Sequence, residues 1–317
     1  MYKTLLRPCM IFVPLLLGQL FPQAHVLGKA PFHCIKYALI LMLFLTFLKL
    51  EFREMRLKRE HFMVVAVNIL LGIVPFFLLK TLFPAHPDPA KAAFYVGITP
   101  TAAAAPAVVS FLNGRTGFAL TGFILSYAVI SLALFLFLPV VSGKLSISFL
   151  FQIFLPLSQI VFLPCLLAFL VRKLFPGAKA LPGKCALFTF SLWSFTLFLM
   201  SATAKMHFIR HPNEPVGELF YIAILSAVLC FLSFFLGGKL ARKKYARESS
   251  QILGQKNTSF TMFLALEFAN PLVAIGPIFY IVCHNSWNAV QMFLYDLHRR
   301  KRAKRALEAE EKEKKHD

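Results

Sequence analysis

Ten long runs of apolar residues divide this sequence, and they constrain the fold more than any other feature. Each run has roughly 17–25 residues, the length that an α-helix needs to cross a ~30 Å hydrocarbon layer. They explain why hydrophobic residues make up 58% of the chain and why 36 of its 317 residues are phenylalanine. The runs lie near residues 5–21, 33–49, 62–83, 92–112, 117–141, 148–171, 184–204, 218–237, 250–269 and 272–295. We therefore expect an all-α membrane protein.

The basic residues lie mostly in alternate short segments between these runs. A net charge of +20 would favour nucleic acid as the partner of a soluble protein, but basic residues beside membrane helices set their orientation instead. Of the Lys and Arg residues between the runs, most lie in the segments 49–59, 172–184 and 239–247, which places these segments and both termini in the cytoplasm. We expect a bacterial inner-membrane protein whose partner is the lipid bilayer, with no nucleic acid. The basic part of the tail, residues 299–305, is a candidate site for anionic lipid headgroups.

Two similar short segments, Gly97–Thr101 and Gly254–Thr258, interrupt the fourth and ninth runs 157 positions apart. Five spans in each half require the second half to cross the membrane in the opposite sense, which is the inverted-repeat plan of many secondary transporters. We predict one repeat in residues 1–141, a second in 142–298, and a charged cytoplasmic tail in 299–317. In this plan helices 4 and 9 are broken and cross.

Each interruption carries residues that can begin a new half-helix. Thr99 followed by Pro100 predicts an N-cap and a first helical position, while Asn257 and Thr258 can cap the second half of the ninth span after Gly254. A helix N-terminus has free N–H groups and partial positive charge, so it favours an anionic ligand. The alternative is that each site is a simple kink.

Lys256 is the most informative polar residue within the spans. An unpaired lysine near the centre of a bilayer costs at least ~2.5–3.5 kcal/mol, so it should face a cavity or a partner. The alternative is that its long side chain reaches back to the cytoplasmic interface. His284 and Asn285 form a second polar cluster, in the last span, where they contact either a neighbouring helix or a substrate.

The sequence resembles the bile acid:sodium symporter family across nearly the whole chain, in the order of its spans. Residues 100–115 look like the family's Pro-Gly-Gly-Thr-Ala-Ser-Asn stretch with its following Gly-Asp. Residues 254–257 are similar to the end of its Glu-Val-Gly-Met-Gln-Asn stretch, and His284-Asn285 matches its His-Asn pair. The resemblance implies a core of spans 3–5 and 8–10 that moves against a panel of spans 1, 2, 6 and 7. It also implies transport of bile acids or other small organic anions with sodium.

The chain departs from the family pattern at the positions that coordinate sodium. Ala105 and Pro106 stand at the Ser-Asn pair, Ile252 stands at the glutamate, and Lys256 replaces the glutamine of the ninth helix. Ala119, Phe123 and Leu70 likewise fall near oxygen-bearing family positions. An ammonium group would repel sodium, so we expect Lys256 to replace the bound cation, either as a fixed positive charge or as a proton carrier.

These features predict a secondary transporter of a small organic anion that works by alternating access, without a cofactor or a metal site. One alternative is a sensor or scaffold with a transporter fold that moves nothing. A membrane enzyme is a weaker alternative, because the spans contain no metal-binding histidine pair and no cluster of carboxylates. The expected substrate-binding residues are Gly97, Thr99, Pro100, Thr101, Gly254, Lys256, Asn257, Thr258, His284 and Asn285.

Overall fold

The computed structural model of the protein describes residues 12–29, 31–49, 55–212 and 216–313. Apart from one isolated β-bridge, these residues form helices and no strand. Five helices are long and apolar enough to cross a membrane, which makes the chain an all-α integral membrane protein. They are α4 (Arg59–Leu82), α7 (Thr116–Ser142), α8 (Ile147–Leu174), α10 (Ala186–Arg210) and α11 (Val216–Leu240).

Shorter elements complete the described part of the chain. The apolar helix α2 (Phe12–Leu20) covers part of the first predicted span, whose start lies outside the described residues, and α3 (Cys34–Leu48) matches the second. Three 3-10 turns and a short helix join longer helices: η1 (Pro22–Gly28), η3 (Pro176–Ala180), α9 (Leu181–Lys184) and η4 (Lys243–Tyr245). The last helix, α14, runs over Pro271–Glu313.

The fourth and ninth apolar runs are each divided into two helices, as the sequence predicts. The fourth run contains the end of α5 (Pro87–Ile98) and α6 (Ala105–Phe111), and the ninth contains the end of α12 (Ala246–Gly254) and α13 (Thr258–Phe268). The predicted start at Thr99 and Pro100 is wrong, because α6 begins only at Ala105, with Pro106 in its first turn. Thr99 instead ends α5, and Pro100 lies in an extended segment whose backbone has other partners.

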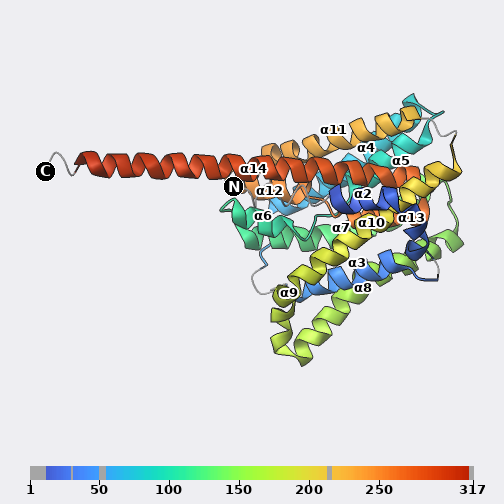
Figure 1. The fold of residues 1–317 in the computed structure, drawn as a ribbon, viewed down its shortest axis with the longest axis horizontal. Coiled ribbons are helices and arrows are strands. Elements are labelled where there is room, and N and C mark those ends of the chain that lie inside the picture. Colours follow the sequence, from blue (N-terminus) through green and yellow to red (C-terminus); the bar gives the residue numbers. More distant parts are fainter. Residues whose placement is uncertain (1–11, 30, 50–54, 213–215, 314–317) are drawn as a thin grey trace.

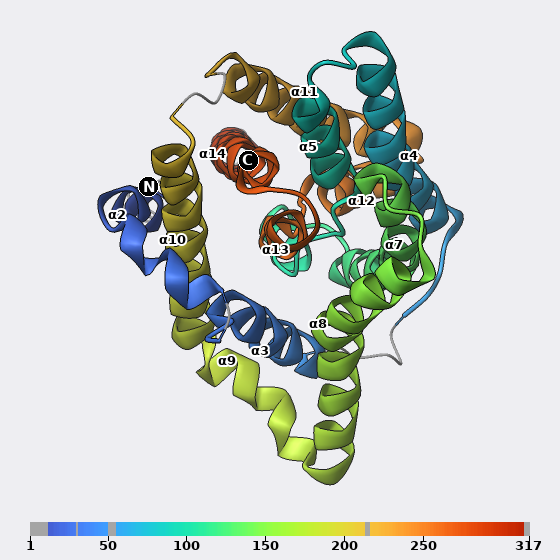
Figure 2. The same cartoon turned by 90° about the vertical axis from the view of Figure 1, so that its right-hand side faces the viewer.

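The helices pack in two groups (Figure 2). One group contains α2, α3, α8 and α10, with α2 against α10 and α3 against α8. The other contains α4, α5, α7 and α11 to α14, and its closest pairs are α4 with α5 and α11 with α12. The two interruptions belong to the second group, and α13 and α14 lie on the side of this group that faces the first group in Figure 2.

Two glycines allow α4 and α5 to pack backbone to backbone. A Cβ atom built on Gly97 would lie 2.0 Å from the carbonyl oxygen of Leu71, and one built on Gly72 would lie 2.7 Å from Cβ of Ile98. Small residues at such crossings let membrane helices approach closely. This contact fixes the C-terminal end of α5 against α4.

Two buried carboxylates join neighbouring elements: Glu248 joins α12 to the start of α7, and Glu60 joins α4 to the segment before η4. Glu248 Oε1 accepts a hydrogen bond of 2.8 Å from the backbone N–H of Arg115, and Glu60 pairs with Arg242. The rings of Phe118 and Tyr245 stack with centroids 4.4 Å apart. These contacts fix the starts of α7 and α12 relative to their neighbours.

The helix α14 continues well beyond the other helices and forms a projecting rod (Figure 1). It passes from residue 298 to residue 299 without a break, so the predicted charged tail begins as a continuation of the last apolar run. Residues 314–317 at the end of the predicted tail lie outside the described residues.

Candidate functional site

The two interrupted segments meet as extended backbone. Thr101 and Lys256 form an antiparallel β-bridge, the N–H of Ala102 donates to the carbonyl of Gln255 over 2.8 Å, and the N–H of Asn257 donates to the carbonyl of Pro100 over 2.8 Å. Backbone polar groups that leave a helix inside a membrane need such partners, since hydrocarbon offers none. Each interrupted segment therefore supplies hydrogen-bond partners for the backbone of the other.

We call the paired residues 100–102 and 255–257 the crossing. Side chains from several helices form hydrogen bonds with it. Thr101 Oγ1 donates to the carbonyl of Ile252 over 2.7 Å, and its N–H donates to Ser126 Oγ over 3.0 Å. The Tyr280 hydroxyl donates to the carbonyl of Gly254 over 2.7 Å, at the end of α12. Because its backbone groups are paired and buried, we expect the crossing to be a rigid platform.

The ammonium group of Lys256 lies inside the helix group that contains the crossing. Nζ donates to Asn68 Oδ1, to the carbonyl of Gly97 over 2.7 Å and to the carbonyl of Thr99 over 3.5 Å. Lys256 is only 2% exposed, so the alternative in which its side chain reaches the interface is wrong. Three acceptors for three N–H groups fit a protonated amine. The carbonyl groups at the C-terminus of α5, where the helix dipole is negative, also favour a cation.

The ligands of Lys256 are all neutral oxygen atoms. Within the part of the chain that the structure describes, no carboxylate lies within ion-pair distance of its Nζ atom. A buried charge normally requires compensation by hydrogen bonds, by an opposite charge or by both. Here hydrogen bonds are present, and no opposite charge among the described residues accompanies them.

A pocket of about 450 Å³ lies beside the crossing, between the two helix groups. One wall comes from the crossing and α14, with Gln255, Lys256, Asn257, Thr258, Ser259, His284 and Asn285. The opposite wall comes from α3 and α10 and is mainly apolar, with Leu39, Met42, Leu43, Phe190 and Trp193. Lys49 and Ala186, at one end of the pocket, are exposed, so the pocket reaches the protein surface there.

The hydrogen bonds of Asn285 define the tautomer of His284. Asn285 Nδ2 lies 2.8 Å from the carbonyl oxygen of Ile281, which fixes the nitrogen of the amide on that side, and 2.9 Å from His284 Nε2. Nε2 of a neutral His284 therefore accepts, and Nδ1 carries the proton. That buried Nδ1–H has no hydrogen-bond partner among the described residues, and His284 lines the pocket. The ring thus has one buried donor without a partner among the described residues.

Asn257 caps α13 at the edge of the pocket, as the sequence predicts. Its Oδ1 accepts from the N–H of Phe260 over 3.3 Å, and its Nδ2 donates to the hydroxyl of Tyr127. The N-terminus of α13 therefore begins at the pocket wall, where its dipole favours negative charge.

The two hydrogen bonds of Asn257 can be separated by substitution. Asn257→Ala loses the cap and should lower the free energy of unfolding by about 1 kcal/mol, with a larger effect if Tyr127 is left unpaired. Asn257→Asp keeps the cap acceptor and should retain more of the stability. Thermal unfolding of the purified variants in detergent measures both, and equal losses would contradict the capping role.

Apart from Lys256, the positions that the resemblance matches to sodium ligands are apolar here, and four of them are closely packed. Ala105, Ala119, Phe123 and Ile252 are each at most 1% exposed. An added Cβ on Gly122 would lie 2.5 Å from the Ile252 side chain, so little free space remains between α7 and α12. Leu70, by contrast, is 54% exposed and faces away from this packing.

All ten residues expected at the site lie at or beside the crossing, but they do not have the same position. Lys256, Asn257, Thr258, His284 and Asn285 line the pocket, whereas the other five shape the backbone behind it. Sequence reasoning missed Asn68 and the apolar wall. Only the polarity of Asn68 within a span could have indicated its role.

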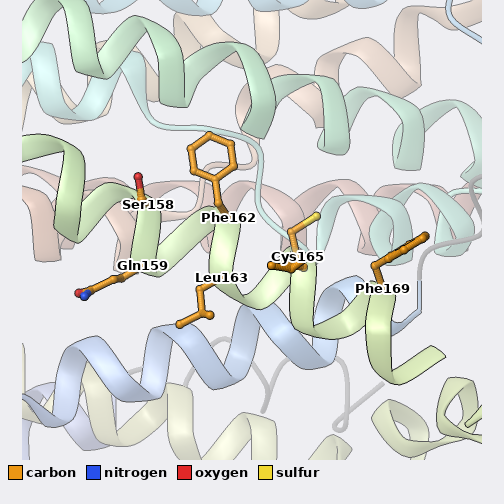
Figure 3. Close-up of a pocket in the computed structure, with 7 residues that line it drawn as sticks. Ser158, Gln159, Phe162, Leu163, Cys165 and Phe169 are labelled. Atoms are coloured by element: carbon orange, nitrogen blue, oxygen red, sulfur yellow. The ribbon is translucent and has the colours of Figure 1, made fainter. Parts of the chain in front are cut away.

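Figure 3 shows another hollow, of about 760 Å³, on α8. Its lining residues, which include Ser158, Phe162, Cys165 and Phe169, all belong to this one helix. Phe162 and Phe169 are exposed, and no second helix of the described residues contributes to the lining. This hollow is a depression in the apolar surface that faces lipid, and it is not a candidate site.

No protein-family model matches the chain, and no curated protein matches it.

Proposed function

We propose that this protein is a secondary transporter of a small organic anion, and that Lys256 replaces the coupling cation. The observation that carries the proposal is the position of Lys256. Its ammonium group is bound by Asn68 and by the C-terminal carbonyls of α5, directly behind a pocket at the crossing of two interrupted helices. A channel for cations would be blocked electrostatically by this charge, whereas an anion in the pocket would be attracted.

The pocket walls support an anion that also has an apolar part. His284 supplies an N–H donor, α13 supplies a helix N-terminus, and Phe190 and Trp193 supply an apolar face. These groups favour a carboxylate or a similar anionic group on the crossing side and carbon-rich surface on the other side.

The arrangement of helices supports alternating access. Interruptions at corresponding positions are typical of inverted-repeat transporters, in which one group of helices rocks against the other. We propose that residues 1–141 and 142–298 are such repeats, with ten spans and both termini in the cytoplasm. In this plan, α2, α3, α8 and α10 are the panel, and the remaining long helices form the moving core. The bile acid:sodium symporter family remains the family that we propose for the chain.

Uptake into liposomes tests the proposal. Purified protein is first heated with a panel of carboxylates and sulfonates, and an anion that raises its unfolding temperature is then used as a labelled substrate. We expect saturable uptake whose rate is unchanged when sodium is replaced by choline, because the tethered ammonium occupies the cation position.

Three other results have distinct meanings. Saturable, stoichiometric dependence on sodium would refute the replacement of the cation by Lys256. Uptake driven by a pH gradient would assign Lys256 the role of a proton carrier in place of a fixed charge. Binding of the anion without any flux would indicate the sensor alternative.

A further inference from the structure

We infer that this protein is an anion exchanger, in which the return of the empty transporter is slow unless a second anion binds. This inference rests on the proposed function. It follows from one difference between a bound ion and a tethered one: a bound cation leaves with the substrate, whereas the charge of Lys256 stays in the protein throughout the cycle.

The tethered charge affects the empty and the loaded transporter differently. In the open state, water fills the pocket beside the wall that contains Lys256, and its high dielectric constant screens the buried charge from a distance. Alternating access requires the two helix groups to close over the pocket, which removes that water and strengthens every electrostatic interaction inside. A bound anion compensates the charge of Lys256 in the closed state, but an empty pocket leaves the charge uncompensated.

The surroundings of Lys256 provide no substitute for the anion. Its three ligands are the neutral oxygens of Asn68, Gly97 and Thr99, and no carboxylate of the described residues pairs with it. The nearby pocket residues Gln255, Asn257 and His284 are neutral amides and an imidazole whose N–H is a donor. Closure without an anion is therefore opposed by the site itself.

The crossing makes it difficult for the lysine to move away during the return step. The backbone of Lys256 forms the β-bridge to Thr101, and the residues before and after it form hydrogen bonds with Ala102 and Pro100. The ammonium group also donates a hydrogen bond to the carbonyl of Gly97, the residue at which α5 contacts the backbone of α4. The charge thus moves with the crossing as one unit.

Trans-stimulation in liposomes tests the inference. Liposomes loaded with the labelled anion are diluted into medium with or without the same unlabelled anion, with valinomycin and potassium present so that charge movement does not limit the flux. Efflux into medium that contains the anion should be roughly tenfold faster or more, because each return step is then made by a compensated transporter. Equal rates with and without external anion would overturn exchange and leave the proposed function intact. Absence of any flux, including exchange, would count against both.

A variant without the charge provides the second test. Lys256→Met removes the ammonium but keeps a side chain of similar length, so its ratio of exchange to net efflux at saturating anion should fall toward one. Lys239→Met is the matched control, because Lys239 is exposed and lies outside the pocket, and its ratio should equal that of the unchanged protein. A Lys256→Met protein that binds the anion and retains full trans-stimulation would also overturn the inference.

Discussion

Lys256→Met should reduce the affinity of the pocket for an organic anion by about 30-fold. A charge pair separated by ~8 Å at an effective dielectric constant of about 20 contributes roughly 2 kcal/mol, which corresponds to this factor. Equilibrium binding of the anion to purified protein, measured by calorimetry, gives the change directly. Lys239→Met serves as the control for the loss of one positive charge and should bind normally.

The ligands of Lys256 allow the same charge to be tested through stability. Asn68→Leu removes the side-chain acceptor and leaves a buried ammonium with one ligand fewer, which should lower the free energy of unfolding by about 3 kcal/mol. In the double variant with Lys256→Met, the charge is absent and the loss should be much smaller than the sum of the single effects. Additive losses would show that Asn68 and Lys256 do not act together.

Among substitutions that add one methyl group to the interrupted segments, Gly97→Ala should lower the free energy of unfolding the most. The new Cβ would lie 2.0 Å from the Leu71 carbonyl oxygen and 2.6 Å from Cα of Gly72, and both are backbone atoms that cannot rotate away. Such overpacking costs about 1–3 kcal/mol or more and would push α5 away from α4. Because Gly97 also ligates Lys256, binding of the anion should weaken together with stability.

Gly117→Ala is the matched control for this substitution. A Cβ at Gly117 meets no atom within 4 Å, and the residue lies in the helix α7, so the change should be neutral or slightly stabilising. Unfolding temperatures of the two variants in the same detergent provide the comparison. Similar temperatures for both would show that the α4–α5 contact tolerates separation.

The features that sequence could predict are those that depend on local chemistry. The apolar runs predict the long helices because helix length follows from bilayer thickness. Gly254 and Asn257 predict the second interruption because a capping amide fixes where α13 begins. The buried environment of Lys256 also follows from its depth in a span. The identity of the groups that bind its ammonium does not.

The features that sequence could not predict depend on contacts between distant segments. The start of α6 was misplaced because Thr99-Pro100 is a suitable local helix start, yet pairing with residues 255–257 keeps this stretch extended. Asn68 and Lys256 are 188 positions apart, and no local pattern relates them. The apolar wall from α3 and α10 looks like any lipid-facing surface until the helices are placed together.

The unbroken course of α14 connects the pocket mechanically with the outside of the bundle. From His284 to Glu313 the helix extends about 44 Å without a proline or a break, so a tilt at the pocket is amplified at the far end. A spectroscopic label near that end would register substrate-driven motion as a change of several ångströms. A molecule that binds the projecting part of α14 would likewise restrict the movement of His284 without contacting His284.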